Sequence, residues 1–297
     1  MFKGENFLEF SDQFQDDSEC LKYLSNIKWS EGYQCSKCGN DRYTIRKDKF
    51  SRECHKCHYI ESPTAKTLFH KIKFSLRKAF AIGFEMTAST KGMSASQIAK
   101  RYDINRKTAW LFMQKVRIAM KSSQKHPIDG VVQVDEFVYG GKENLKQGRS
   151  KNTKKKKIVA AVSLTDEGKV ERVYFKLLED YSSKSIRAIF DKHISKEAEV
   201  HTDKWTAYIP LSKEYNIIST LSDNGKGLPQ IHIIIHQLKS WLRSTFSWMH
   251  EEHIEKYLNE YSFRLNRSIF KDTIFHKLIQ RMMHASPTTY QEIKVST

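Results

Sequence analysis

Two short apolar segments that each end in an aspartate decide the fold: Val131-Val132-Gln133-Val134-Asp135 and Glu199-Val200-His201-Thr202-Asp203. Their length and their β-branched content are typical of buried strands. A carboxylate at the end of such a strand is unfavourable unless it is solvated, paired or bound to a cation. Either aspartate alone could simply cap a strand or a turn. On neighbouring strands, the two would form an oxygen-rich site suited to Mg²⁺, which usually binds one or two carboxylates together with substrate phosphates.

The composition indicates an intracellular protein that binds a polyanion. The chain has 297 residues, 39% of them hydrophobic, which is enough for one large domain or two to three small ones. The formal net charge is +17, and lysines and arginines gain affinity by releasing counterions from phosphates. No apolar stretch approaches the length of a membrane-spanning helix, and the N-terminus lacks the pattern of a signal peptide. We therefore expect a nucleic-acid partner, no membrane, and a cytoplasmic, nucleoid-associated location.

Four of the five cysteines form two CxxC pairs: Cys35, Cys38, Cys54 and Cys57. In an intracellular chain, this spacing fits a tetrahedral zinc site of four thiolates better than disulfides or a redox site. So short a region has little core, and bound Zn²⁺ would provide much of its folding energy. Cys20 stands outside the pattern, and we expect it to be a buried apolar residue.

A helix-turn-helix is predicted after the cysteine-rich region. Segment 75–86 has apolar residues at helical spacing, and two further helical segments, 94–102 and 106–120, follow it. Ser94 or Ser96 can cap the first of these two, and residues 103–105 interrupt them. The second helix would present three polar residues to a DNA groove: Asn105, Arg106 and Lys107. The same basic residues could instead form only a solvated helix face.

A mixed sheet flanked by helices is predicted beyond a turn-rich joint at 126–130. The expected order is three strands, a helix, two strands, and helices. Their ranges are 131–138, 158–164 and 170–177 for the first strands, 182–195 for the helix, 199–203 and 217–220 for the later strands, and from about 230 onward for the helices. This order is typical of the α/β class. A basic loop at 142–157 begins near Asp135, which favours DNA contact over a solvated hairpin. We expect three of its lysines to contact DNA: Lys154, Lys155 and Lys156.

A later helical segment, 230–243, adds further candidate site residues. His232, His236 and Lys239 follow i, i+4, i+7 spacing and so share one helix face. A neutral imidazole can bind a metal or relay a proton, and a lysine can hold a phosphate. A histidine on a helix is more often structural. The two upstream aspartates favour a functional role for His232 and Lys239 instead.

Several sequence blocks occur together in an order that resembles a known family. They are the four cysteines and the segments 67–70, 107–110, 134–142, 201–203, 238–243 and 257–267. In these blocks the chain resembles the DDE-type transposases of insertion sequences related to the Merlin elements, which carry a zinc ribbon ahead of the catalytic domain. The resemblance runs from about residue 29 to residue 266.

The resemblance implies a ribonuclease H-like catalytic domain, with Asp135 on its first strand and Asp203 on its fourth. The third metal-site residue of this family lies on a late helix, seven positions before a lysine or arginine. Here that position is His232, before Lys239, where related transposases usually have Glu or Asn. A neutral histidine gives the metal site one negative charge less than a carboxylate does. Glu136 would point to the opposite face of a regular strand, so we expect it to lie outside the metal site.

The resemblance also implies an activity: binding of double-stranded DNA at terminal inverted repeats, followed by strand cleavage and transfer into a target. Mg²⁺ or Mn²⁺ would serve catalysis, Zn²⁺ would be structural, and a homo-oligomer would form on DNA. Two alternatives stay open. His232 favours a DNA-binding protein with an inactive nuclease fold, while a metal-dependent, structure-specific nuclease would share the acids.

The expected domain organisation has four parts. They are an N-terminal segment with the zinc ribbon (1–66), a helical helix-turn-helix region (67–126), the catalytic domain (127–270), and a C-terminal helix and tail (271–297). No function is predicted for the last part.

Overall fold

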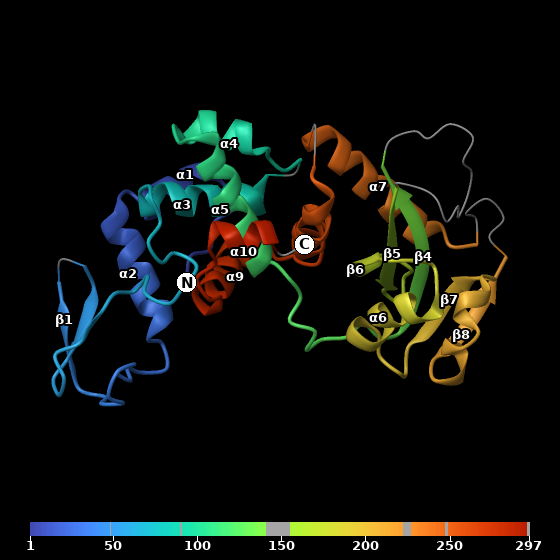
Figure 1. Cartoon of the computed structure of the whole chain (residues 1–297), viewed down its shortest axis with the longest axis horizontal. Helices are drawn as coiled ribbons and strands as arrows, with labels where there is room; N and C mark the ends of the chain where they lie inside the picture. Colours follow the sequence, from blue (N-terminus) through green and yellow to red (C-terminus); the bar gives the residue numbers. More distant parts are fainter. Residues whose placement is uncertain (48, 90, 141–154, 222–226, 247–248, 296–297) are drawn as a thin grey trace. The chain divides into compact units, whose positions relative to one another are not determined.

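A computed structural model describes the chain except for residues 48, 90, 141–154, 222–226, 247–248 and 296–297 (Figure 1). The chain divides into two compact units, which are described separately. One comprises Met1–Met120 together with Ser268–Thr297, and the other comprises Lys121–Arg267. In the described part of the chain, no helix combines the length and apolar character that crossing a membrane would need.

The first unit begins with two helices and a small antiparallel sheet. The helices are α1 (Phe7–Gln13) and α2 (Asp17–Lys28), and the strands, in sheet order, are β1 (Tyr43–Arg46), β2 (Ser51–Cys54) and β3 (Ile60–Glu61). The core under this sheet consists mainly of Trp29, Tyr33 and cysteine side chains. The guanidinium of Arg52 lies 4.4 Å from the ring centroid of Trp29 and 4.1 Å from that of Tyr43. A core this small depends on an additional crosslink for its stability.

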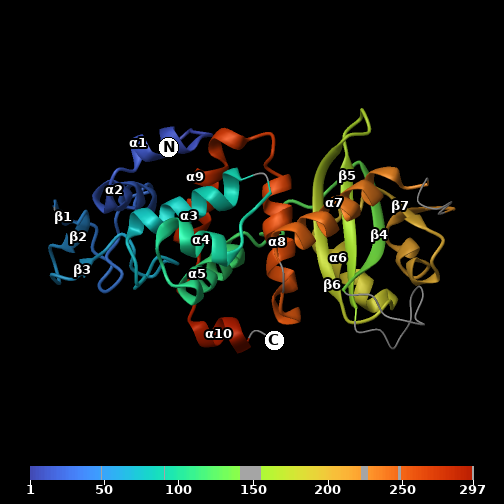
Figure 2. The ribbon, with the colours of Figure 1, turned by 90° about the horizontal axis from the view of Figure 1, so that it is seen from above.

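The rest of the first unit is helical: α3 (Leu76–Ala88), α4 (Ala95–Tyr102), α5 (Arg106–Ala119), α9 (Lys271–His284) and α10 (Tyr290–Val295). α9 packs alongside α3 although they are far apart in the sequence (Figure 2). The ring of Phe275 on α9 lies 5.6 to 5.8 Å from five other phenylalanine rings, those of Phe2, Phe10, Phe14, Phe80 and Phe84. The C-terminal helix is therefore part of the hydrophobic core of this unit.

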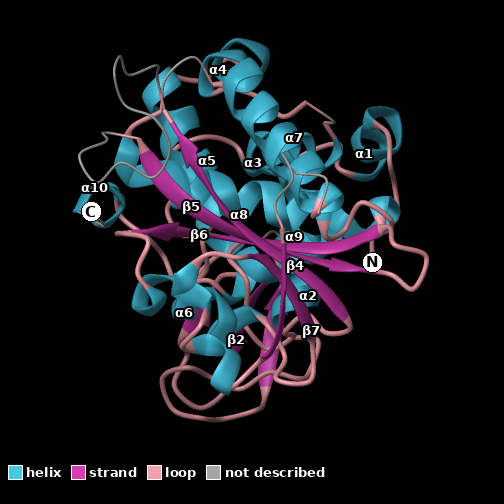
Figure 3. Ribbon diagram, turned by 90° about the vertical axis from the view of Figure 1, so that its right-hand side faces the viewer, coloured by secondary structure: helices cyan, strands magenta, loops and turns pink. Residues whose placement is uncertain are grey.

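The second unit contains a five-stranded mixed sheet (Figure 3). Its strands are β4 (Val131–Tyr139), β5 (Lys156–Leu164), β6 (Val170–Leu178), β7 (Glu199–Asp203) and β8 (Asn216–Thr220), and their order is β6-β5-β4-β7-β8. The first three are antiparallel neighbours, whereas β7 is parallel to β4 and β8 is parallel to β7. This strand order is that of a ribonuclease H-like fold, so the predicted fold class is confirmed.

Helices cover both faces of this sheet. They are α6 (Ser183–His193), α7 (Pro229–Thr245) and α8 (Ile254–Leu265), with short 3-10 helices η1 (Thr206–Tyr208), η2 (Leu211–Lys213) and η4 (Glu251–His253). Val132 and Val134 of β4 pack in a cluster with α6, whereas Phe137 packs in a second cluster with α7 and α8. The alternation of side chains along β4 thus directs its odd-numbered residues, Asp135 among them, toward the α7 face.

His193, at the end of α6, makes the stability of the second unit depend on pH. Its ring stacks on Tyr174 with centroids 4.2 Å apart. Burial, aided by the charges of Lys192 and Lys176, lowers the pKa of His193 from 6.5 to about 4. Between these two values the unfolded chain binds a proton that the folded protein does not. Stability is therefore lost as the pH falls below about 6.5.

We predict that His193→Gln flattens this dependence. Between pH 7 and pH 4.5, the free energy of unfolding should fall more steeply for the wild type than for His193→Gln. The difference between the two slopes should be at most about 1.4 kcal/mol per pH unit. Urea denaturation at each pH measures this difference. Any acid-induced loss of metal from the first unit is common to both proteins and cancels. Parallel slopes for the two proteins would contradict the prediction.

Candidate active site

Asp135 and Asp203 are brought together by the parallel pairing of β4 with β7. The register pairs Val134 with Thr202, so the two aspartates follow at the same level on neighbouring strands. In parallel strands, residues at the same level point to the same face. One carboxylate oxygen from each of Asp135, Glu136 and Asp203 lies within 4.8 Å of the other two.

Backbone amides orient both aspartates. The N–H of Glu136 donates to Oδ1 of Asp135 at 2.9 Å, and the N–H of Trp205 donates to Oδ1 of Asp203 at 3.1 Å. Ionised carboxylates at this separation repel one another, and a divalent cation between them relieves the repulsion. The atoms of this acidic group that could bind a metal are all carboxylate oxygens, and such ligands suit Mg²⁺ or Mn²⁺.

The position of Glu136 differs from the sequence-based expectation. We expected this residue to lie outside the metal site because strand alternation directs it away from Asp135. Its carboxylate nevertheless lies in the same acidic group as those of Asp135 and Asp203, so its side chain does not point away from them as expected. The β4–β7 pairing ends at Val134 and Thr202, and β7 ends at Asp203. Glu136 still pairs with β5 but lies beyond the last residue of β4 that pairs with β7, where its side chain can turn toward Asp203.

α7 places His232 beside the acidic group. The Nε2 atom of His232 lies 3.7 Å from Oδ2 of Asp135. The start of α7 is held on the sheet because the N–H of Ile231 donates to Oε1 of Gln133 at 2.9 Å. Burial, followed by the charge of Lys239, lowers the pKa of His232. The imidazole is therefore neutral at neutral pH and able to donate a nitrogen lone pair.

Lys239 follows on the same helix. Its ammonium lies 5.0 Å from the ring centroid of Phe137, the second residue after Asp135. Burial and then the nearby Arg243 lower the pKa of Lys239, whereas Asp135 acts in the opposite direction. Lys239 is thus within electrostatic reach of Asp135.

The helix-turn-helix residues lie on exposed surface of the first unit. Ser94 caps α4 in a capping box with Gln97, which decides between the two serines considered as caps. The Asn105 side chain caps α5 by accepting the N–H of Lys107 at 2.8 Å. Arg106 and Lys107 are exposed in the first turn of α5.

The predicted basic loop is described only at its end. Lys154 lies outside the described residues. Lys155 is half-buried, and Lys156 forms an ion pair of 2.6 Å with Glu251 at the start of η4. This pair is partly exposed, so Lys156 is within reach of solvent and of a polyanion.

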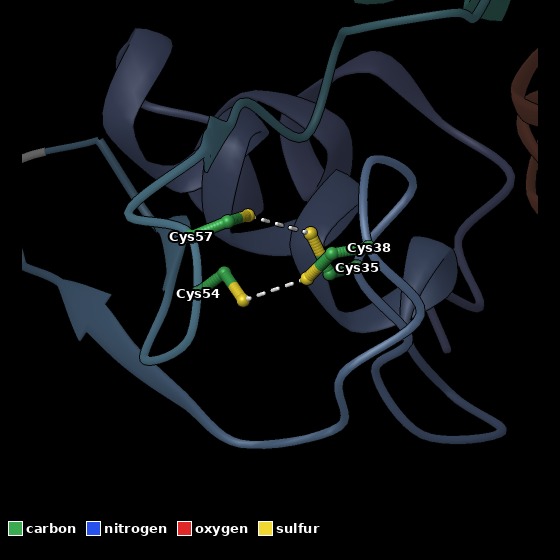
Figure 4. A group of neighbouring side chains, drawn as sticks. All are labelled: Cys35, Cys38, Cys54 and Cys57. Carbon is green, nitrogen blue, oxygen red and sulfur yellow. Dashed lines mark hydrogen bonds between the residues drawn. The ribbon is translucent and has the colours of Figure 1, made fainter.

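The four CxxC cysteines converge in the first unit (Figure 4). The sulfurs of Cys35 and Cys57 are 3.6 Å apart, as are those of Cys38 and Cys54. Four sulfurs at about 2.3 Å from a tetrahedral zinc would be about 3.8 Å from one another, so the geometry fits Zn²⁺. Cys20 is fully buried elsewhere, as expected, and burial raises the pKa of its thiol.

Two family models match the chain, one over the segment with the acidic group and the other over the segment with the four cysteines. Residues 127–266 match the ISXO2-like transposase domain, and residues 15–60 match the transposase zinc-ribbon domain. Together the two matches span more than half of the chain and define a DDE-type insertion-sequence transposase with an N-terminal zinc ribbon. Within that class, the chain belongs to the IS1595 family, so the predicted resemblance is confirmed.

Comparison with solved structures returned chains of Mos1 transposase complexes. The pre-cleavage Mos1 transpososome is 13% identical, with 69% of this chain and 77% of that chain covered and a TM-score of 0.30. The Mos1 strand transfer complex is 11% identical, with 68% and 75% covered and a TM-score of 0.30. The Mos1 mariner paired end complex with Mn is 13% identical, with 67% and 76% covered and a TM-score of 0.28. No curated protein matched the sequence.

We predict that the purified protein holds one Zn²⁺ per chain and that Cys38→Ala abolishes this binding. Removing one of four thiolates opens the tetrahedral site and removes much of the folding energy of the ribbon. Metal analysis by mass spectrometry would report zinc content, and the change in total tryptophan fluorescence, to which Trp29 beside the cysteines contributes, would report local folding. Cys20→Ala is the matched control and should retain zinc. Equal zinc content in both variants would contradict the assignment.

Proposed function

We propose that this protein is the transposase of an insertion sequence. In this proposal it binds double-stranded DNA at the terminal inverted repeats and catalyses metal-dependent strand cleavage and strand transfer. One observation carries the proposal: in a chain of this family, Asp135 and Asp203 converge from neighbouring parallel strands. Two such carboxylates can hold divalent ions against a phosphate.

The chemistry assigns a task to each site residue. Divalent ions bound there would activate water or a DNA 3′-hydroxyl and stabilise the leaving oxygen of the scissile phosphate. Asp135 and Asp203 provide the charged ligands for Mg²⁺ or Mn²⁺. His232, neutral and 3.7 Å from Asp135, provides the third side chain of the set. Lys239 contributes a positive charge that orients the phosphate and offsets its negative charge.

DNA recognition is assigned to the basic surfaces. Asn105, Arg106 and Lys107 begin the exposed first turn of α5, a helix N-terminus that favours phosphate contacts and groove entry. The lysines Lys154, Lys155 and Lys156 precede or begin β5, the neighbour of the Asp135 strand, and would attract the DNA backbone. Joining two element ends to one target requires at least two subunits, so a homo-oligomer on the nucleoid DNA is part of the proposal.

One observation favours a second candidate function. His232 is neutral, so the set Asp135, Asp203 and His232 carries only two negative charges. If this negative charge is too small to hold the divalent ions, the protein would bind DNA but its nuclease fold would be inactive. The following substitutions decide between the two functions.

We predict that Asp135→Asn and Asp203→Asn each reduce strand cleavage below about one hundredth of the wild-type rate. Each change removes a charged metal ligand. Substituting even the residues that hydrogen-bond to metal ligands typically lowers metal affinity or activity by about 10–100-fold. His232→Ala should reduce cleavage strongly, whereas His232→Glu should retain it. The assay is Mg²⁺- or Mn²⁺-dependent nicking of DNA that carries the element end. Asp166→Asn, in an exposed turn, is the control.

Two results would contradict this assignment. Full activity of His232→Ala would show that the imidazole takes no part. Inactivity of the wild type with every divalent metal, together with intact DNA binding, would establish the inactive nuclease fold instead.

We further predict that the double variant Arg106→Ala/Lys107→Ala weakens binding to the element end. The slope of the logarithm of the binding constant against the logarithm of salt concentration should become smaller by about one to two. Fluorescence anisotropy at several salt concentrations measures both quantities. Lys3→Ala/Lys22→Ala removes two exposed charges from the same unit and should change affinity little. Equal effects of the two double variants would show that α5 does not recognise DNA.

A further inference from the structure

Glu136 is a buried acid for which the proposed mechanism has no task. Its side chain is only 8% exposed, and it directly follows Asp135 on β4. One of its carboxylate oxygens lies within 4.8 Å of oxygens of both Asp135 and Asp203. Burying an ionised carboxylate is strongly unfavourable without a compensating partner. Its position beside two further carboxylates increases the need for positive charge.

The ends of the strands explain how Glu136 reaches the site. Strand alternation starts its side chain on the α6 face, with Val132 and Val134. Glu136 pairs with Val159 of β5, but the pairing of β4 with β7 ends one residue before the aspartates, so the β7 side of Glu136 has no paired strand residue. The hydrogen bond that the Glu136 N–H donates to Oδ1 of Asp135 fixes the Asp135 carboxylate close to the Glu136 backbone.

Tyr208 lies close to this acidic group. It belongs to η1, shortly after β7, and is 2% exposed. Burial raises the pKa of Tyr208 well above its usual value, and the nearby Glu136, Asp135 and Asp203 act in the same direction. Tyr208 is therefore a buried neighbour of Glu136, and a purely structural role for Glu136 as the partner of this phenol has to be tested against a metal-binding role.

The charge of the site gives Glu136 its task. Asp135 and Asp203 together carry two negative charges, and the neutral His232 adds none. Two divalent cations carry four positive charges. A third carboxylate brings the ligand set closer to neutrality and adds the hard oxygen donor that Mg²⁺ and Mn²⁺ prefer.

We propose that Glu136 is a third carboxylate ligand of the divalent-metal site, supplying at the end of β4 the negative charge that His232 does not provide. This inference rests on the proposed function, since it concerns the same metal site. It differs from a purely structural role, in which Glu136 would serve only as a partner of Tyr208.

Direct Mn²⁺ binding by the full-length, zinc-loaded protein tests the proposal without DNA. Free Mn²⁺ measured by electron paramagnetic resonance gives the dissociation constant. Glu136→Gln keeps the shape and removes the charge, so the dissociation constant should rise by at least about 10-fold. Glu199→Gln, a charge loss on β7 outside the acidic group, and Tyr208→Phe should stay within about twofold of the wild type.

Each outcome decides the question. Wild-type Mn²⁺ binding in Glu136→Gln, or an equal loss in Tyr208→Phe, overturns the proposal in favour of a structural role. If Glu136→Gln does not fold, Glu136→Asp keeps the charge but shortens the reach, and unchanged Mn²⁺ binding by that variant overturns the proposal.

The same titration separates this inference from the proposed function. Mn²⁺ binding that is lost in Asp135→Asn but kept in Glu136→Gln refutes only the role of Glu136. Binding that is weakened by Glu136→Gln, in a protein that never cleaves DNA, supports the role of Glu136 and refutes the transposase function. A wild type that binds no Mn²⁺ at this site overturns both.

Discussion

The parallel pairing of β4 with β7 is the constraint on which the proposed chemistry depends. Its register places Asp135 and Asp203 at the same level on neighbouring strands, and a shift of one residue would send one of them to the opposite face. The apolar residues of both strands fix this register, because Val132 and Val200 pack in one buried cluster with α6. The hydrophobic core of the sheet thereby determines the geometry of a polar site.

In the proposed function, metal would have a different task in each unit. In the second unit, hydrophobic clusters cover both faces of the sheet, and a metal would serve the reaction. In the first unit, the core near the cysteines consists of a few aromatic rings and the sulfurs themselves, so bound zinc supplies stability. Metal removal should therefore unfold the ribbon while leaving the ribonuclease H-like sheet intact.

Local sequence patterns were sufficient to predict the strands of the five-stranded sheet and the zinc-ribbon cysteines, because both follow from residue type and spacing. The approach of Asp135 to Asp203 was expected only if their strands were neighbours, and the family resemblance implied that arrangement. Two features could not be predicted in this way. The approach of Glu136 depends on where β7 ends relative to β4, and the packing of α9 depends on Phe275 meeting rings far away in the sequence. Both are set by tertiary contacts, which single-sequence periodicity does not contain.

The central claim is that Asp135 and Asp203 together hold divalent metal in this fold. The most direct measurement is X-ray diffraction from crystals grown with Mn²⁺, recorded at the manganese absorption edge. We predict an anomalous peak within ligand distance, about 2.0–2.6 Å, of carboxylate oxygens from both aspartates. A crystal that shows manganese only at other surface carboxylates, with Asp135 and Asp203 ordered and unliganded, would contradict the claim.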